Sequence, residues 1–396
     1  MKRPPKTSRK PSAARIKIPD CKNFTGYKPC FPETRCYLKC VSPHPRGKCI
    51  LIINLDALGN VLVTTSLLPA IKRKYPRSHI SWITLGNAAP LLQNNPLIDR
   101  VFTWDGESWL ILQQLRFDVV MNADKSQRSG ALAMALRARE KLGFGINPHG
   151  VIIPLNKEAH ENYILGLDDH LKFKINQKTV SRILCETFKL RYKRDEYVLS
   201  LTPEDQDFCQ RYKESVEIRD EEFVVGFNTG CSDLFPNKKM TIEQHVALIT
   251  RLLPIPGLRL VLVGGVEDAQ RNAEIARQVG DKVISTPTSE GIRRGLCYIN
   301  VCDLVITGDS FGMHAAIGLK KRVIAWFGVS SATEVDLYGR GVKLVAQGLE
   351  CSPCWKRVCP YHLECIQMID TEAIVGHVQS YLSAWRSSGS RERVYA

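Results

Sequence analysis

A pattern of apolar strand, glycine-containing turn and amphipathic helix begins twice in this chain, and it restricts the fold more than any other feature. The first copy opens at residues 49–75, where a continuous apolar run at 50–53 leads into a turn and a helix. An apolar run without polar alternation is typical of a parallel strand that is covered on both faces. Further strands are expected at residues 79–85, 100–105 and 117–123, with helices between most of them. This alternation predicts a doubly wound α/β sheet.

The second copy repeats the architecture in the C-terminal half. A strand and turn at residues 223–230 precede a helix at 240–253, and strand-and-turn units are expected again at 258–268, 302–310 and 321–328. In a doubly wound sheet, ligands bind at the carboxyl ends of the strands. Two Rossmann-like halves in one chain therefore predict a ligand held in a cleft between them.

The chain divides into three parts on this basis. We predict a basic tail and cysteine-rich extension at residues 1–48, a first Rossmann-like domain at 49–215, and a second Rossmann-like domain at 222–385. A chain of 396 residues exceeds what one hydrophobic core usually organises, which agrees with two domains. The extension has little apolar surface, so it needs a staple other than a core of its own.

The chain is basic, with a net charge of +15 and a dense run of Lys and Arg at residues 2–17. Such an excess suits anionic partners: nucleic acid, an anionic membrane face or phosphorylated substrates. The plainer alternative is a solvated tail that only aids solubility. No motif of a nucleic-acid-binding module accompanies the charge, so nucleic acid is not the expected partner.

No apolar run is long enough to cross a bilayer, and the basic N-terminus lacks the apolar segment of a secretory signal. The expected location is therefore the cytoplasm. Peripheral contact with the anionic inner face of the cytoplasmic membrane is a further hypothesis that the charge raises.

Fourteen cysteines in a cytoplasmic chain favour metal binding over disulfides. Cys351-x2-Cys354-x4-Cys359-x5-Cys365 supplies four thiols in a tetrahedral-site pattern, which suits zinc, mononuclear iron or an iron–sulfur cluster. His362 lies inside this segment as a reserve ligand. A looser set near the N-terminus predicts a second metal site, with flexible reduced thiols as the alternative; its members are Cys21, Cys30, Cys36 and Cys40.

Two motifs and the cysteine segment that follows them resemble glycosyltransferase family 9, the ADP-heptose:lipopolysaccharide heptosyltransferases. The first motif is Leu55-Asp56-Ala57-Leu58-Gly59-Asn60, after the first strand and before a helix. The second is Gly308-Asp309-Ser310-Phe311-Gly312-Met313-His314-Ala315-Ala316. The resemblance covers roughly residues 50–385. It implies a GT-B fold, in which two Rossmann-like domains face across a cleft.

The resemblance also implies an inverting transfer of a heptose or similar sugar from a nucleotide-sugar donor, ADP-heptose above all, to a lipopolysaccharide core or other surface glycan. It implies no divalent metal for the transfer itself, while some related enzymes carry iron in a similar cysteine segment. The donor would bind the second domain, with phosphate at Lys238 and at the turn and helix N-terminus nearby, ribose at Glu267 or Asp268, and donor sugar at Asp309. The remaining donor-binding residues expected there are Asn228, Thr229, Ser232, Ser310, Gly312, Met313 and His314.

Asn60 stands where the family has its catalytic aspartate, and this is the main departure from the pattern. An amide has no basic lone pair, so Asn60 cannot accept the proton of an acceptor hydroxyl. Asp56 on the same turn, another carboxylate or a substrate phosphate would have to replace it. Two further hypotheses stay open: a catalytically silent nucleotide-sugar or glycan-binding protein, and a metal- or redox-responsive regulator on the same scaffold.

Overall fold

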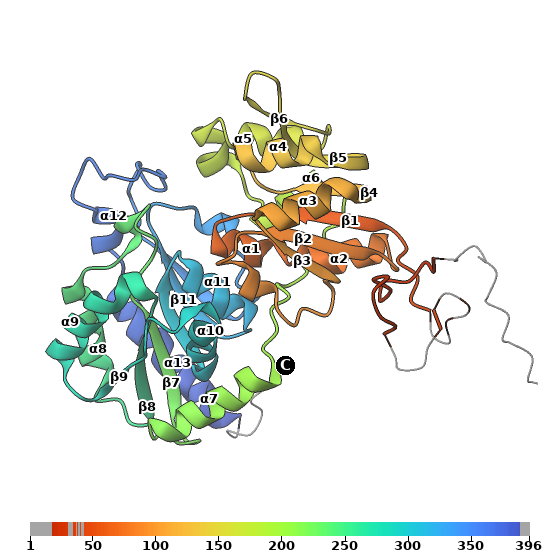
Figure 1. The fold of residues 1–396 in the computed structure, drawn as a ribbon. Coiled ribbons are helices and arrows are strands. Elements are labelled where there is room, and N and C mark those ends of the chain that lie inside the picture. Colours follow the sequence, from red (N-terminus) through yellow and green to blue (C-terminus); the bar gives the residue numbers. More distant parts are fainter. Residues whose placement is uncertain (1–17, 31–34, 37, 39, 41–42, 389–396) are drawn as a thin grey trace, which may run out of the picture.

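The computed structural model describes residues 18–30, 35, 36, 38, 40 and 43–388, and they form two α/β domains (Figure 1). The basic tail at residues 2–17 lies outside this part of the chain. Each domain is built on one six-stranded sheet. Both halves of the predicted repeat are therefore confirmed.

The first sheet has the strand order β3-β2-β1-β4-β5-β6, and its last strand is antiparallel to its neighbour. Its strands are β1 (Cys49–Ile53), β2 (His79–Thr84), β3 (Arg100–Thr103), β4 (Arg116–Asn122), β5 (Arg137–Ile146) and β6 (Ile152–Pro154). Its helices are α1 (Leu58–Thr64), α2 (Leu67–Lys74), α3 (Gly106–Gln114), α4 (Gln127–Ala135), α5 (Ala159–Leu165) and α6 (Val180–Thr187). The apolar run of β1 is fully buried from Ile50 to Ile53, as the lack of polar alternation predicts.

The second sheet has the order β12-β11-β10-β7-β8-β9, and all its pairs are parallel. Its strands are β7 (Phe223–Asn228), β8 (Leu258–Val263), β9 (Val283–Ser285), β10 (Leu304–Gly308), β11 (Arg322–Phe327) and β12 (Gly341–Val345). The helices of this half are α7 (Pro203–Ser215), α8 (Ile242–Leu252), α9 (Ala269–Val279), α10 (Gly291–Val301), α11 (Phe311–Gly318), α12 (Glu364–Gln367) and α13 (Thr371–Ser387).

The two sheets share one topology. Numbered within its own domain, each reads 3-2-1-4-5-6, so the direction of winding reverses between strands 1 and 4. That reversal leaves a crevice at the carboxyl ends of β1 and β4 in the first domain, and of β7 and β10 in the second. The turns that follow these four strands are therefore where ligand-binding residues are expected.

The domains are joined by an extended linker, residues 188–202 between α6 and α7, which makes ion pairs with both of them. Arg73 of α2 pairs with Asp195 at 2.6 Å, and the next residue along the linker, Glu196, pairs with Arg340 of the second domain at 2.8 Å. After the linker, α7 packs on α10, where the Cys209 thiol donates to the Cys297 carbonyl at 3.5 Å. In the folded chain α7 thus packs with the second domain.

Helix α13 and the N-terminal extension each pack on one of the two domains. Helix α13 packs on the second sheet through the buried Ile374, Val378 and Leu382. At the other end, Lys22 of the extension pairs with Asp99 at 2.9 Å, and the extension lies on the side of the first domain that faces away from the second (Figure 1). Within the described ranges no helix is long and apolar enough to cross a membrane.

Candidate functional site

The turn between β1 and α1 presents the two residues that the first motif assigns to catalysis. Asp56 is half-exposed and pairs with Arg128 of α4 at 2.6 Å. Asn60 lies exposed in the first turn of α1, where its side chain makes no hydrogen bond to the described residues. The structure therefore places both residues at the carboxyl edge of the first sheet, and Asp56 is ion-paired with Arg128.

A buried carboxylate that was not predicted from the sequence holds this turn in place. Asp124 follows β4, and its side chain accepts hydrogen bonds from the Asn54 amide and the Leu55 backbone N–H, both at 2.5 Å. Burial raises the pKa of Asp124 to about 7, and the nearby charge of Asp56 contributes in the same direction. The only clue in the sequence is that an acid directly follows the strand expected beside strand one.

The turn after β7 is tied to the turn after β10. Asn228 donates from its amide to the Ser310 hydroxyl at 2.9 Å and to the Thr307 hydroxyl at 3.1 Å. A Cβ at Gly312 would lie 2.4 Å from the Asn228 amide oxygen, so only glycine allows this approach. Thr229 is buried and donates to Asn272. Asn228 and Thr229 thus build the turn, while Ser232 beyond them is exposed.

Lys238 and Asp309 form a buried ion pair of 2.7 Å at the carboxyl edge of the second sheet. Burial by itself would raise the pKa of Asp309, but the charge of Lys238 and its hydrogen bond hold that pKa below its ordinary value. The ammonium of Lys238 also lies 4.5 Å from the ring centre of Trp355, which packs on Phe235 at 4.6 Å. The two residues assigned to donor phosphate and donor sugar are therefore in direct contact.

Helix α11 begins beside this ion pair and reaches the first domain. Ser310 caps it by accepting from the Met313 N–H at 3.4 Å, and Met313 itself is fully buried. His314 lies with Nε2 3.9 Å from Asp309 and with Nδ1 3.2 Å from the Tyr197 hydroxyl. Burial lowers the pKa of His314, so its imidazole is neutral at pH 7.

Glu267 and Asp268, the two acids expected from the sequence to bind the ribose, differ in their surroundings. Asp268 is buried and accepts from the Gly265 N–H at 3.0 Å, and a Cβ at Gly230 would collide with its carboxylate. Burial raises the pKa of Asp268. Glu267 is exposed. Asp268 therefore shapes the turns after β7 and β8, and Glu267 is the acid that remains open to a ligand.

Charged groups from both domains meet between the sheets. Glu334 follows β11, and its carboxylate lies 3.9 Å from Lys172 of the helical turn η2 (Leu171–Ile175) in the first domain. Lys125 directly follows Asp124, and partial desolvation together with the charge of Lys172 lowers its pKa to about 8. No motif marks these residues, and none was predicted from the sequence.

The four C-terminal cysteines lie together in one small cavity of about 20 Å³, whose lining includes Cys351, Cys354, Cys359 and Cys365. Burial and the charges of the other three thiols raise the pKa of Cys365 to about 11. Among the described residues, however, no three His, Cys, Asp or Glu side chains are grouped closely enough to hold one ion. The segment also contacts the first domain, where Lys174 donates to the Glu350 carbonyl at 3.0 Å.

The N-terminal cysteines lie in the extension, on the side of the first domain that faces away from the second domain. Cys21 is buried, Cys36 and Cys40 are half-buried, and Cys30 is exposed. The finding that no metal-holding group occurs in the described ranges applies to this set as well. A second metal site therefore stays a prediction.

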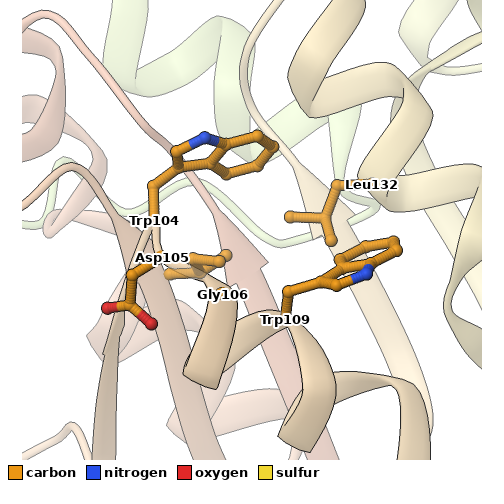
Figure 2. A pocket seen from close by; sticks show the side chains of 6 residues that line it. Trp104, Asp105, Gly106, Trp109 and Leu132 are labelled. Carbon is orange, nitrogen blue, oxygen red and sulfur yellow. The ribbon is translucent and has the colours of Figure 1, made fainter.

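A cavity of about 230 Å³ opens on the first domain between α3 and α4 (Figure 2). Trp104 and Trp109 face each other across it, and Leu132 closes one side. The carboxylate of Asp105 points away from both indole rings and accepts from the Ser108 N–H at 2.8 Å. The cavity is thus an apolar slot with two half-exposed tryptophans, which no motif in the sequence indicated.

Comparison with known proteins agrees with this architecture. Residues 109–364 match the model of glycosyltransferase family 9 (heptosyltransferase). Lipooligosaccharide heptosyltransferase 2 of Campylobacter jejuni is 25% identical over 182 residues, which span 44% of this chain and 56% of that protein. This chain thus matches little more than half the length of that relative.

Solved structures show the same fold at low identity. The ADP-heptose lipopolysaccharide heptosyltransferase II of Escherichia coli superposes with a TM-score of 0.64 and 16% identity, covering 85% of this chain and 99% of that one. The iron-containing dodecameric glycosyltransferase TibC of enterotoxigenic E. coli gives a TM-score of 0.52 and 13% identity, covering 86% and 80%. The GT-B fold predicted from the sequence is confirmed. Because the family match spans more than half of the residues, this chain belongs to glycosyltransferase family 9, the heptosyltransferase family.

Proposed function

We propose that this chain is an inverting glycosyltransferase that moves a heptose from ADP-heptose to a lipopolysaccharide core or another surface glycan. The observation that carries the proposal is the buried Lys238–Asp309 pair beside the start of α11. A cation and helical N–H groups at one point suit a diphosphate leaving group, because they stabilise the charge that develops as it departs. The solved relative that is named for ADP-heptose supports this choice of donor.

The first domain supplies the features that an acceptor would meet. It carries three cationic side chains that suit an anionic glycan. Lys125 follows β4, Arg128 begins α4 and pairs with Asp56, and Lys172 faces Glu334 of the second domain. The Trp104–Trp109 slot adds an apolar wall, and aromatic faces pack well on the apolar face of a sugar ring or on a lipid portion. An acidic glycolipid fits this combination better than a neutral small molecule does.

Asn60 favours a second candidate function, a nucleotide-sugar or glycan-binding protein without turnover. Incubation of the purified chain with ADP-heptose and a heptose-deficient lipopolysaccharide core separates the two. The transferase should release ADP only when the acceptor is present and should extend the core by one sugar. ADP binding without release or extension would establish the silent binder instead.

The cysteine cavity supports a structural metal ion or cluster in addition to the transfer reaction. Cys351, Cys354, Cys359 and Cys365 would hold zinc or iron, because the four side chains already line one cavity and the other three make ionisation of Cys365 more costly. A bound cation would remove that cost. The iron-containing relative TibC supports iron as one of the two candidates. A regulatory role for this metal rests on no observation beyond the cysteines themselves.

A further inference from the structure

The transfer reaction needs a group that accepts the proton of the acceptor hydroxyl, and Asn60 cannot supply it. The assignment of this proton acceptor rests on the proposed function and concerns the same interdomain region. A carboxylate is suitable only if it lies between the two domains and is not already held by a short ion pair or hydrogen bond. Four acids near this region can be compared on those terms: Asp56, Asp124, Asp309 and Glu334.

Three of them are occupied. Asp56 is bound to Arg128 at 2.6 Å. Asp124 uses both oxygens to hold the β1–α1 turn. Asp309 is bound to Lys238 at 2.7 Å and also faces His314. Each would have to abandon a structural partner in order to accept a proton from substrate.

Glu334 differs from the other three. Its carboxylate accepts no hydrogen bond from the residues that the structure describes, and its closest cation is Lys172 at 3.9 Å. The side chain is 17% exposed, which leaves a path for a hydroxyl group to reach it. The short helical turn η5 (Ala332–Glu334) carries it on the second domain, and the partner lysine belongs to the first. Glu334 therefore lies between the two domains with no short ion pair or hydrogen bond to the described residues on either oxygen.

We propose that Glu334 is the general base of this chain and takes the role that an aspartate at position 60 has in the family. Its position links it to both substrates. Asp309 and Lys238 on the donor side, and Lys125 and Lys172 on the acceptor side, all act on its carboxylate through their charges.

The protonation chemistry of Glu334 agrees with this role. Burial raises the pKa of Glu334, Asp309 raises it as well, and the three lysines oppose both effects. A base is most effective when its pKa lies near the working pH, because it is then both ionised and able to hold a proton. An anionic acceptor would also draw Lys172 toward itself, which would free the carboxylate further.

In the proposed step, transfer of the sugar and transfer of the proton are coupled. The acceptor hydroxyl oxygen forms a bond to the anomeric carbon of the donor sugar while its proton passes to a carboxylate oxygen of Glu334. The bond from that carbon to the diphosphate oxygen breaks, and ADP leaves with the electron pair beside Lys238. Glu334 then returns the proton to solvent.

The test is the variant Glu334→Gln, which keeps the shape and removes the basic oxygen. We expect kcat to fall by about 10²-fold or more, the range for loss of a general base, while ADP affinity measured by calorimetry is unchanged. Glu140→Gln is the matched control, because Glu140 pairs with Lys189 on the first domain outside the site. A Glu334→Gln enzyme with the kcat of the unmodified chain, or one that loses ADP affinity in proportion, overturns the proposal.

A second pair of variants guards against a merely structural effect. Glu334→Asp keeps a carboxylate and should retain part of the turnover, with an ascending pH limb that Glu334→Gln lacks. Restoring the family residue in Asn60→Asp/Glu334→Gln should recover turnover, because the proton then has another acceptor. Equal loss in Glu334→Asp and Glu334→Gln, or no recovery in the double variant, contradicts Glu334 as the base.

The proposed function can fail separately from this inference. If the unmodified chain and Asn60→Asp both bind ADP but neither extends any acceptor, the transferase proposal is wrong, and the base assignment falls with it. If the unmodified chain turns over and Glu334→Gln does so equally well, only the base assignment is wrong.

Discussion

Gly59 of the first domain lies directly against His314 of the second, and a Cβ at position 59 would be 2.7 Å from the His314 Cδ2 atom. This contact joins the start of α1 to the start of α11, so the two motifs of the sequence meet across the domain boundary. Tyr197 of the linker bonds to the far side of the same imidazole at 3.2 Å. The neutral ring of His314 thus lies between the turn that carries Asn60 and the residues that we propose for the donor, and it sets how closely the two approach.

Replacing Gly59 with Ala should destabilise the chain by about 1 to 3 kcal/mol, the usual cost of overpacking, because the imidazole is held on its other side by the Tyr197 hydroxyl. Thermal unfolding measures the effect. Gly376→Ala in α13 is the matched control, since a Cβ there meets nothing within 4 Å. A helical Gly→Ala change at such an open position ordinarily stabilises by up to about 1 kcal/mol. Equal melting temperatures for the two variants would show that the contact is not tight.

Lys238→Ala should weaken ADP binding by about 1.5 to 3 kcal/mol, the range for a hydrogen bond to a charged group. The variant also leaves the buried carboxylate of Asp309 without its partner, so a lower melting temperature is expected alongside. Calorimetry with ADP is the measurement, and Lys282→Ala, an exposed lysine of the same domain, is the control. ADP affinity equal to that of the unmodified chain would contradict the role of Lys238.

The sequence predicts those features of the fold that depend on a short stretch of neighbouring residues. The buried run at residues 50–53 and the glycine turns identify parallel strands, because such strands are apolar on both faces and end in ligand-binding turns. Asp309 and Lys238 could be named only because they match positions that the resemblance to the family assigns to the donor. Their contact with each other depends on how the segments after β7 and β10 come together, and the contact of Lys238 with Trp355 depends on how the cysteine segment folds back. No local sequence pattern predicts either contact.

The interdomain groups could not be predicted in this way. Glu334 lies in a short helical turn without a motif, and its relation to Lys172 exists only after the two domains have docked. Asp124 resembles any acid after a strand until the fold buries it beneath the β1–α1 turn. Chemistry that depends on burial and on contacts between domains is therefore read from the structure.

Asp124 should make stability depend on pH near neutrality. Its pKa is about 7 in the folded chain and near 3.8 when exposed, so folding favours the protonated form. The stability that this provides is fully present below pH 3.8 and is lost as the pH rises through about 7. Between pH 6 and pH 8 the loss should be about 1 kcal/mol, since one pKa unit corresponds to 1.36 kcal/mol. Reversal of the Asn54 amide would let the protonated acid donate to the Asn54 Oδ1 atom, which otherwise has no partner among the described residues.

Chemical unfolding at pH 6 and pH 8 measures this difference. Asp124→Asn cannot ionise and should reduce the difference to the background of the other groups. An Asp124→Asn chain that keeps the full pH dependence would show that another group is responsible.

Trp109→Ala should raise the KM for the glycan acceptor by about threefold to tenfold, which corresponds to the loss of an aromatic contact worth about 0.5 to 1.5 kcal/mol. ADP affinity should not change, because the slot lies on the first domain and the donor residues lie on the second. Leu110→Ala, an exposed neighbour on α3 that does not line the slot, is the control. An unchanged acceptor KM in Trp109→Ala would remove the slot from the acceptor site.

The cysteine segment should bind one metal ion or cluster whose role is structural. Four thiols fill a tetrahedral shell and leave no open position for substrate, so the metal should affect stability before it affects chemistry. The segment is anchored at the second sheet, where the Cys354 N–H donates to the Val329 carbonyl at 3.1 Å, and it carries Trp355 against Lys238.

Cys354→Ser should therefore lower metal content and melting temperature together, whereas Cys49→Ser, outside the segment, should leave the metal content unchanged. Elemental analysis of reduced protein that has not met a chelator is the direct measurement. Less than about half an equivalent of zinc plus iron in the unmodified chain would contradict the prediction, because a structural site is occupied in nearly every folded molecule.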